Sequence, residues 1–190
     1  MKKYVKLYIV AVTLLLISIG AVIFLIATGL NATPRTFTTL TPEVVKSFCS
    51  AKLRYAYAIL CIPLIIAFIM FAGTVDSMSK NRPKAPEIIF VVTIELIFVL
   101  VAAFFCCVMS VKTIVDINNN EPRIETVQLT DKYIKGSRRN TKYYAVFSNG
   151  AEDDIPKYEF DNYRSDRDYY VIMCGDTCVD SFDSNKYELP

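Results

Sequence analysis

The sequence predicts a membrane α-helical protein with three transmembrane helices and a small C-terminal all-β, barrel-like domain. Two observations predict this class. The chain is 53% hydrophobic, and its apolar residues gather in three blocks, each long enough to cross a hydrocarbon core, which takes roughly 20 helical residues. The last 71 residues instead alternate polar and apolar side chains between turn signals, a pattern that is typical of short strands.

The first predicted span covers residues 7–30 and follows the basic residues Lys2, Lys3 and Lys6. A basic start before an apolar run is also typical of a signal peptide, whose apolar core is roughly 7–15 residues long. Because the run in this chain is longer, we expect a retained transmembrane helix.

The second and third predicted spans cover residues 55–75 and 88–111. The helix that contains the second span begins at Thr41-Pro42-Glu43, which supplies an N-cap hydroxyl, a proline at the first helical position and an acid at the positive end of the helix dipole. Three asparagines at 118–120 end the third helix. The predicted transmembrane domain is therefore residues 1–119.

The distribution of charge predicts the topology. Residues 1–119 hold 11 Lys/Arg and 5 Asp/Glu, a net charge of +6, whereas residues 120–190 hold 10 and 14, a net charge of −4. Basic residues precede the first span and fill the connector 76–86, and short basic segments tend to stay in the cytoplasm. We expect a multi-pass protein of the cell membrane with a cytoplasmic N-terminus and an extracytoplasmic C-terminal domain.

Residues 120–190 form the second predicted domain, a small soluble β-barrel. The turn signals Asn149-Gly150 and Gly175-Asp176 predict two hairpins. Five short strands in about 70 residues fit an SH3-like or OB-like barrel better than a free-standing sheet. The expected strands are residues 125–133, 142–148, 151–155, 168–174 and 177–182, with a short helix or turn over 156–167.

The C-terminal domain also carries the segments YYAVFSNG at 143–150 and YYVIMCG at 169–175, with a crossing segment between them. In this order the segments resemble the small C-terminal β-barrels, of SH3-like or OB-like type, of uncharacterised bacterial multi-pass membrane proteins. The resemblance covers Thr141 to Asp183. A Gly-Asp pair that precedes the fourth strand in those proteins is Arg167-Asp168 here, which leaves that turn open. The resemblance implies a fold and no function.

Glu95 is the one ionisable residue inside a predicted span. An acid at membrane depth costs a few kcal/mol on insertion scales, so such residues usually face a bundle interior or a water-filled cavity. Two functional readings are a proton or ion site and a hydrogen-bonded contact with a partner helix. The alternative is that Glu95 lies close enough to the interface to be hydrated or protonated there.

Cys174 and Cys178 flank Gly175-Asp176-Thr177 at the second predicted hairpin. With a three-residue loop, the two thiols would face each other near disulfide geometry. We expect either a disulfide, which requires an extracytoplasmic domain, or two inert thiols. The other cysteines of the apolar segments, Cys61, Cys106 and Cys107, are expected to pack as small hydrophobic residues.

Other features predict little chemistry. Arg138 and Arg139 form an exposed loop tip that is available to headgroups or an acidic partner, although a solvated loop is the simpler reading. The chain has no histidine, the commonest general base and metal ligand. It also lacks a phosphate-binding loop, a dinucleotide fingerprint and a nucleophile–base pair. We therefore predict no enzyme, no cofactor, no metal site and, given the acidic C-terminal domain, no nucleic-acid partner.

These observations favour a protein-interaction role over catalysis. The expected partners are the lipid bilayer and either a membrane protein or further copies of the chain. The predicted role is an accessory or scaffold subunit of a membrane complex, or an immunity-type protein against a membrane-active toxin. The alternative is an oligomeric channel or transporter component that uses Glu95.

Overall fold

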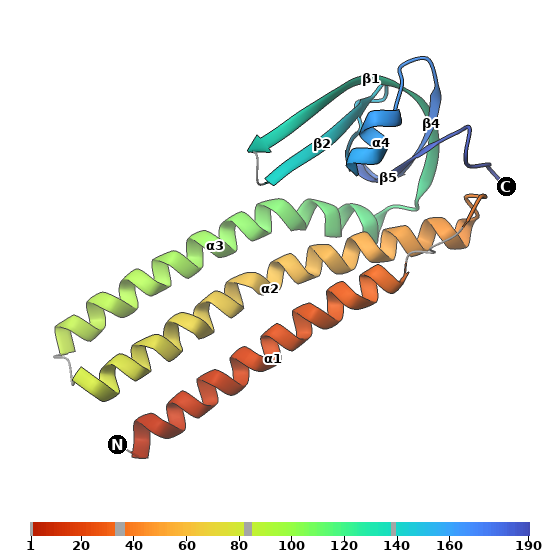
Figure 1. Cartoon of the computed structure of the whole chain (residues 1–190). Coiled ribbons are helices and arrows are strands. Elements are labelled where there is room, and N and C mark those ends of the chain that lie inside the picture. Colours follow the sequence, from red (N-terminus) through yellow and green to blue (C-terminus); the bar gives the residue numbers. More distant parts are fainter. Residues whose placement is uncertain (1, 33–36, 82–84, 138–139) are drawn as a thin grey trace. The chain divides into compact units, whose positions relative to one another are not determined.

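The computed structural model describes residues 2–32, 37–81, 85–137 and 140–190 (Figure 1). The chain divides into two compact units. The helical unit is Met1–Gly29 with Arg54–Val111, and the β unit is Leu30–Leu53 with Lys112–Pro190. The second helix of the chain contributes residues to both units.

Three long helices dominate the first 119 residues: α1 (Lys2–Ala32), α2 (Pro42–Asn81) and α3 (Ala85–Asn119). Within the described residues, α2 and α3 are long and apolar enough to cross a membrane. Within the part of α1 whose side chains are described, the apolar stretch is Val12–Thr28, which is shorter than the roughly 20 residues that a span needs. The helical class is confirmed, and two of the three predicted spans lie in helices that meet the length and apolarity of a membrane span among the described residues.

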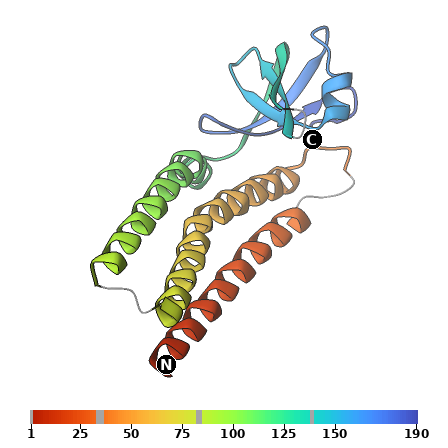
Figure 2. The same cartoon turned by 60° about the vertical axis from the view of Figure 1, so that its left-hand side comes forward.

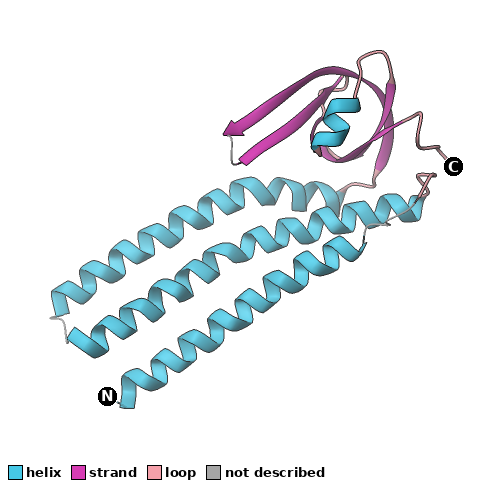
Figure 3. Ribbon diagram, in the orientation of Figure 1, coloured by secondary structure: helices cyan, strands magenta, loops and turns pink. Residues whose placement is uncertain are grey.

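The β unit contains a nearly closed antiparallel sheet of five strands in the order β3-β2-β1-β4-β5 (Figure 2, Figure 3). The predicted small all-β, barrel-like architecture is confirmed. Hydrogen bonding between β5 and β3 side chains joins the two edges of the sheet, because Ser181 Oγ donates to Asp153 Oδ2 at 2.6 Å. The strands are β1 (Arg123–Ser137), β2 (Asn140–Phe147), β3 (Glu152–Ile155), β4 (Asp168–Cys174) and β5 (Thr177–Asp183), with the short helix α4 (Lys157–Asn162) between β3 and β4.

Strand β1 is the centre of this sheet and is longer than the sequence predicted. Residues 123–128 of β1 pair with β4, and residues 129–137 pair with β2. The register shifts between Leu129 and Asp131, which marks an irregularity where β1 changes from one partner strand to the other. A β-bulge of this kind bends a strand and increases its twist, which lets one strand serve both halves of a curled sheet.

The β unit has two apolar cores, and β4 separates them. Successive side chains of a strand point to opposite faces. Val171 and Met173 therefore enter the first core with Phe147 and Tyr169, while their neighbours Ile172 and Cys174 enter the second. The second core is completed by residues that precede the second span, namely Leu40, Val45 and Cys49, which are all buried.

The connector before α2 is fixed to the C-terminal tail. Leu40 N donates to Glu188 O, and Glu188 N donates to Thr38 O, each at 2.8 Å. The ring of Phe37 lies within 5.6 Å of the rings of Phe48, Phe182 and Tyr187, measured between centroids. The β unit is thus assembled from two segments that are far apart in the sequence.

We expect Gly175→Ala to destabilise the β unit more than Gly150→Ala. Both glycines have positive φ, +57° and +81°, so alanine adds about 1–2 kcal/mol of backbone strain at either site. A Cβ at Gly175 would also lie 2.8 Å from Asn120 Nδ2 and 3.2 Å from Asp116 Cγ, whereas a Cβ at Gly150 meets nothing within 4 Å. Thermal unfolding in mild detergent, followed by tyrosine circular dichroism, measures the difference. Equal losses in the two variants would show that the turn at Gly175 is not packed against Asn120.

Candidate functional site

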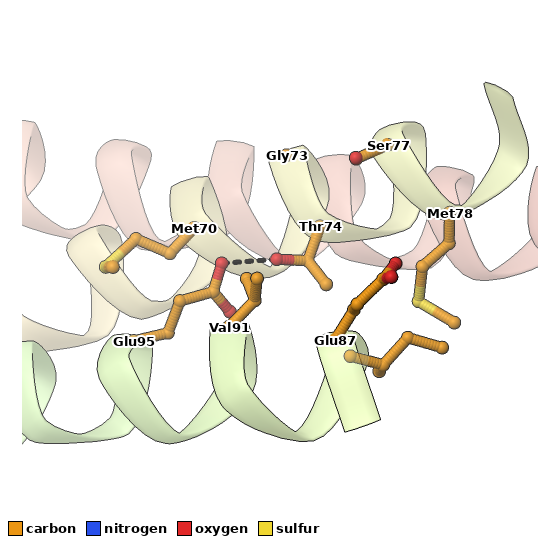
Figure 4. A pocket seen from close by; sticks show the side chains of 9 residues that line it. Met70, Gly73, Thr74, Ser77, Met78, Glu87, Val91 and Glu95 are labelled. Atoms are coloured by element: carbon orange, nitrogen blue, oxygen red, sulfur yellow. Dashed lines mark hydrogen bonds between the residues drawn. The ribbon is translucent and has the colours of Figure 1, made fainter. Parts of the chain in front are cut away.

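Glu95 lies in a groove between α2 and α3 inside the helical unit (Figure 4). The groove has a volume of about 580 Å³. Its lining combines carboxylates, hydroxyls, methionines and a glycine: Met70, Gly73, Thr74, Ser77, Met78, Glu87, Ile88, Val91 and Glu95.

The Glu95 side chain is half-buried and points across the groove toward α2, where Thr74 Oγ1 donates a hydrogen bond to Glu95 Oε1 (Figure 4). Thr74 is itself buried. Between two membrane-spanning helices, a hydrogen bond contributes about 0.6–2 kcal/mol to stability. This is less than the free-energy cost of inserting a carboxylate into the hydrocarbon core. The Thr74 hydroxyl therefore offsets only part of that cost.

Glu87 shares the groove with Glu95. The two residues are eight positions apart on α3, so they lie on one face of the helix, two turns from each other. Figure 4 shows both carboxylates turned toward α2. Two acids with Thr74 and Ser77 give the groove acceptor groups along its length, and none of its described lining residues is a Lys or Arg.

The sequence predicted Glu95 but missed its partner Thr74. The two residues are distant in the sequence, and their contact requires α2 and α3 to lie antiparallel beside each other. A signal was present, since Thr74 lies seven residues before the end of α2 and Glu95 lies ten residues after the start of α3. An antiparallel helical hairpin brings such positions to the same level.

The structure does not bring Cys174 and Cys178 together. The β4–β5 hairpin pairs Cys174 with Thr177 and Met173 with Cys178, so its turn holds two residues where the disulfide interpretation assumed three. Cys174 is buried in the second core, whereas Cys178 packs against the first. Instead, Cys174 Sγ lies 3.3 Å from Cys49 Sγ.

The β unit contains a buried polar network that sequence reasoning missed. Asp153 is 5% exposed and accepts from Ser181 Oγ, and the Tyr163 hydroxyl donates to Ser181 O at 3.1 Å. Burial raises the pKa of Asp153. Burial, with a smaller contribution from the charge of Asp153, raises the pKa of the neighbouring Asp180 to about 7.

Lys52, near the start of α2, is the cation of this network. Its ammonium group donates to Val179 O at 3.3 Å. Its positive charge opposes the effect of burial and lowers the pKa values of Asp153 and Asp180. The contact of Lys52 with β5 was not predictable from the local sequence, because it depends on the packing of the second core.

The sequence also predicted an interaction loop at Arg138 and Arg139, which lie outside the described residues. Within the parts of the chain that the structure describes, no group of three or more His, Cys, Asp or Glu side chains is arranged to hold a metal ion.

The chain matches no protein-family model, no curated protein and no solved structure. The resemblance of the C-terminal domain to small barrels of bacterial membrane proteins therefore stays a prediction.

We expect the β unit to lose stability as the pH rises from about 4 to about 7. Asp180 has a folded-state pKa of about 7, well above its ordinary value, so the folded state favours the protonated acid. The stability that this preference supplies is present in full below the ordinary pKa and is lost as the pH rises through 7, by about 4 kcal/mol. Asp180→Asn should reduce this loss in thermal unfolding between pH 5 and pH 8.

Asp176→Asn is the matched control, because Asp176 lies exposed on the nearby turn. This variant should keep the pH dependence of the wild-type chain. An Asp180→Asn variant whose melting temperature falls between pH 5 and pH 8 as steeply as that of the wild type would contradict the assignment.

Proposed function

We propose that this chain is an integral membrane protein with three spans that binds a helix of a membrane partner in the groove beside Glu95. In this role it is an accessory or scaffold subunit of a membrane complex. The observation that carries the proposal is an acid-lined groove in the helical unit whose glycine surface is open.

The membrane assignment rests on the apolar surfaces of the helices. None of the most apolar 18-residue window of α3 is buried inside the chain, and only 17% of the corresponding window of α2 is buried. A helix that is apolar on all sides and uncovered by its own chain is typical of a membrane span. Helix α1 extends over 31 residues, or about 46 Å, so its length supports a third span.

The groove suits a helix rather than a lipid chain. Gly73 and Ser77 lie one turn apart on α2, and small residues at this spacing let a second backbone approach closely. A Cβ placed at Gly73 would meet nothing within 4 Å, so this surface is open. Met70 and Met78 border it, and methionine adapts to irregular contacts.

The polar groups of the groove favour a partner that donates hydrogen bonds. An ionised carboxylate has about four acceptor positions, and Thr74 occupies one of those on Glu95. Lipid tails cannot donate to the others. A Ser, Thr, Asn, Gln or Lys side chain on a partner helix would do so, and this need is the basis of the proposed specificity.

The rival function is an oligomeric channel or transporter component. In that case several copies of the chain would place Glu95 along a shared path for protons or ions. The same groove supports both functions, so the identity of what binds there separates them.

We expect Glu95→Gln to keep the partner and Glu95→Leu to lose it. Glutamine retains an acceptor oxygen at the same position, whereas leucine removes it. Co-purification in mild detergent, with quantification of bound protein, should show less than a threefold change for Glu95→Gln and roughly a tenfold loss for Glu95→Leu.

Thr74→Val and Thr93→Val form a matched control pair. Thr74 bonds Glu95, whereas Thr93 is exposed and bonds only the carbonyl of Ile89 in its own helix. Only Thr74→Val should weaken co-purification. Equal recovery of partner with Glu95→Gln and Glu95→Leu would refute the partner contact. Recovery of the chain only with itself, together with proton flux that Glu95→Gln abolishes, would favour the channel.

The proposed topology has three spans, a cytoplasmic N-terminus and an extracytoplasmic β unit. We expect an N-terminal epitope tag to be protected in intact cells, while a single cysteine at the exposed position Lys157 reacts with an impermeant maleimide in a chain without its native cysteines. A cysteine at Lys80 is the control and should react only after permeabilisation. A tag and a Lys157→Cys label on the same side would contradict the third span.

A further inference from the structure

Two buried thiols meet in the second core of the β unit. Cys49 comes from the first part of α2 and Cys174 from the end of β4, and their sulfur atoms are 3.3 Å apart. Their side chains are almost fully buried, with residue exposures of 6% and 0%. The residues are 125 positions apart in the sequence.

We propose that Cys49 and Cys174 form a structural disulfide that links the start of α2 to β4 when the β unit lies in an oxidising compartment. Nothing in the hairpin interpretation of Cys174 anticipates this partner. The inference is independent of what binds in the groove beside Glu95.

The surroundings favour this pair over any other in the chain. Cys178 faces the first core, and Cys61, Cys106 and Cys107 belong to the helical unit. The sulfur atoms of Cys49 and Cys174 are in contact, at a distance about 1.3 Å longer than an S–S bond. Both positions are held by regular structure, one by a helix and the other by a paired strand.

The reaction is a two-electron oxidation. Each thiol loses its proton, one S–S bond forms, and the two electrons pass to a protein disulfide of the thiol–disulfide oxidase class. That oxidant first forms a mixed disulfide with one cysteine and leaves as a dithiol after the second cysteine attacks.

The electrostatic environment indicates when the bond forms. Burial, reinforced by the neighbouring Cys174, raises the pKa of the Cys49 thiol to about 12, and burial also raises the pKa of Cys174. Thiolates are the reactive species, so the folded pair reacts slowly. Oxidation therefore belongs to the folding stage, before the second core closes, and the finished bond is shielded from reductants.

The bond would tie together the two sequence segments that build the β unit. Residues 30–53 and 112–190 are otherwise joined by apolar packing and by hydrogen bonds such as those of Leu40 and Lys52. A cross-link between such distant residues removes much of the freedom of the unfolded chain. Its effect is greatest on the docking of α2 residues onto β4 and β5.

The test counts free thiols in the full chain purified without reductant, by alkylation in denaturant followed by mass spectrometry. The chain has six cysteines, so a Cys49–Cys174 bond leaves four free thiols. Cys49→Ser and Cys174→Ser should each show five, because each variant releases the partner thiol, and Cys178→Ser should show three. Peptide mapping of the wild type should recover the peptides of Cys49 and Cys174 joined, and this measurement needs no variant to fold.

Other counts overturn the proposal. Six free thiols in the wild type would show that no bond forms. Three free thiols in Cys49→Ser with five in Cys178→Ser would show that Cys174 pairs with Cys178. Heating in the presence of a reductant, which reaches the bond as the second core opens, should also lower the melting temperature of the wild type and leave that of a Cys49→Ala/Cys174→Ala double variant unchanged.

Discussion

The packing of residues 37–49 on β4 and β5 is the constraint on which the β unit depends. Strand β4 is apolar on both faces, so its alternate residues Ile172 and Cys174 need a cover that the barrel interior cannot supply. Phe37, Leu40 and Val45 provide that cover. Burying one such side chain stabilises a fold by about 1.5–3 kcal/mol, so removing this segment would leave β4 with an exposed apolar face.

The same packing explains the charges around β5. Docking of α2 brings Lys52 to the carbonyl of Val179, in the region where burial raises the pKa values of Asp153 and Asp180. The positive charge of Lys52 at the edge of this buried network reduces the electrostatic cost of the acids. The apolar core and the polar network are therefore two parts of one packing surface. A change in either would alter how the first residues of α2, up to Lys52, pack on β4 and β5.

Local patterns in the sequence were sufficient to predict the existence and order of the helices and strands, although not the full length of β1 or the loop length at Gly175-Asp176. Apolar run length identified α2 and α3, and Asn149-Gly150 and Gly175-Asp176 identified the hairpins. The contacts between distant segments were not predictable in this way. Cys49 meets Cys174 because a helix start docks on a strand end, and the hairpin interpretation of Cys174 assumed one loop residue too many. In the same way, Thr74 meets Glu95 only through the folding of two helices.

Glu95 shows why a local pattern identifies a site and leaves its ligand open. Its position in an apolar helix makes burial of the carboxylate energetically unfavourable. Among the described residues, the hydroxyl of Thr74 donates one hydrogen bond to it. The rest of the lining toward α2 offers thioethers, the backbone of Gly73 and the Ser77 hydroxyl. A carboxylate with acceptor positions left over in an open groove is stabilised by any donor that enters it. Whether that donor is a partner side chain or water determines whether the groove assembles a complex or conducts protons.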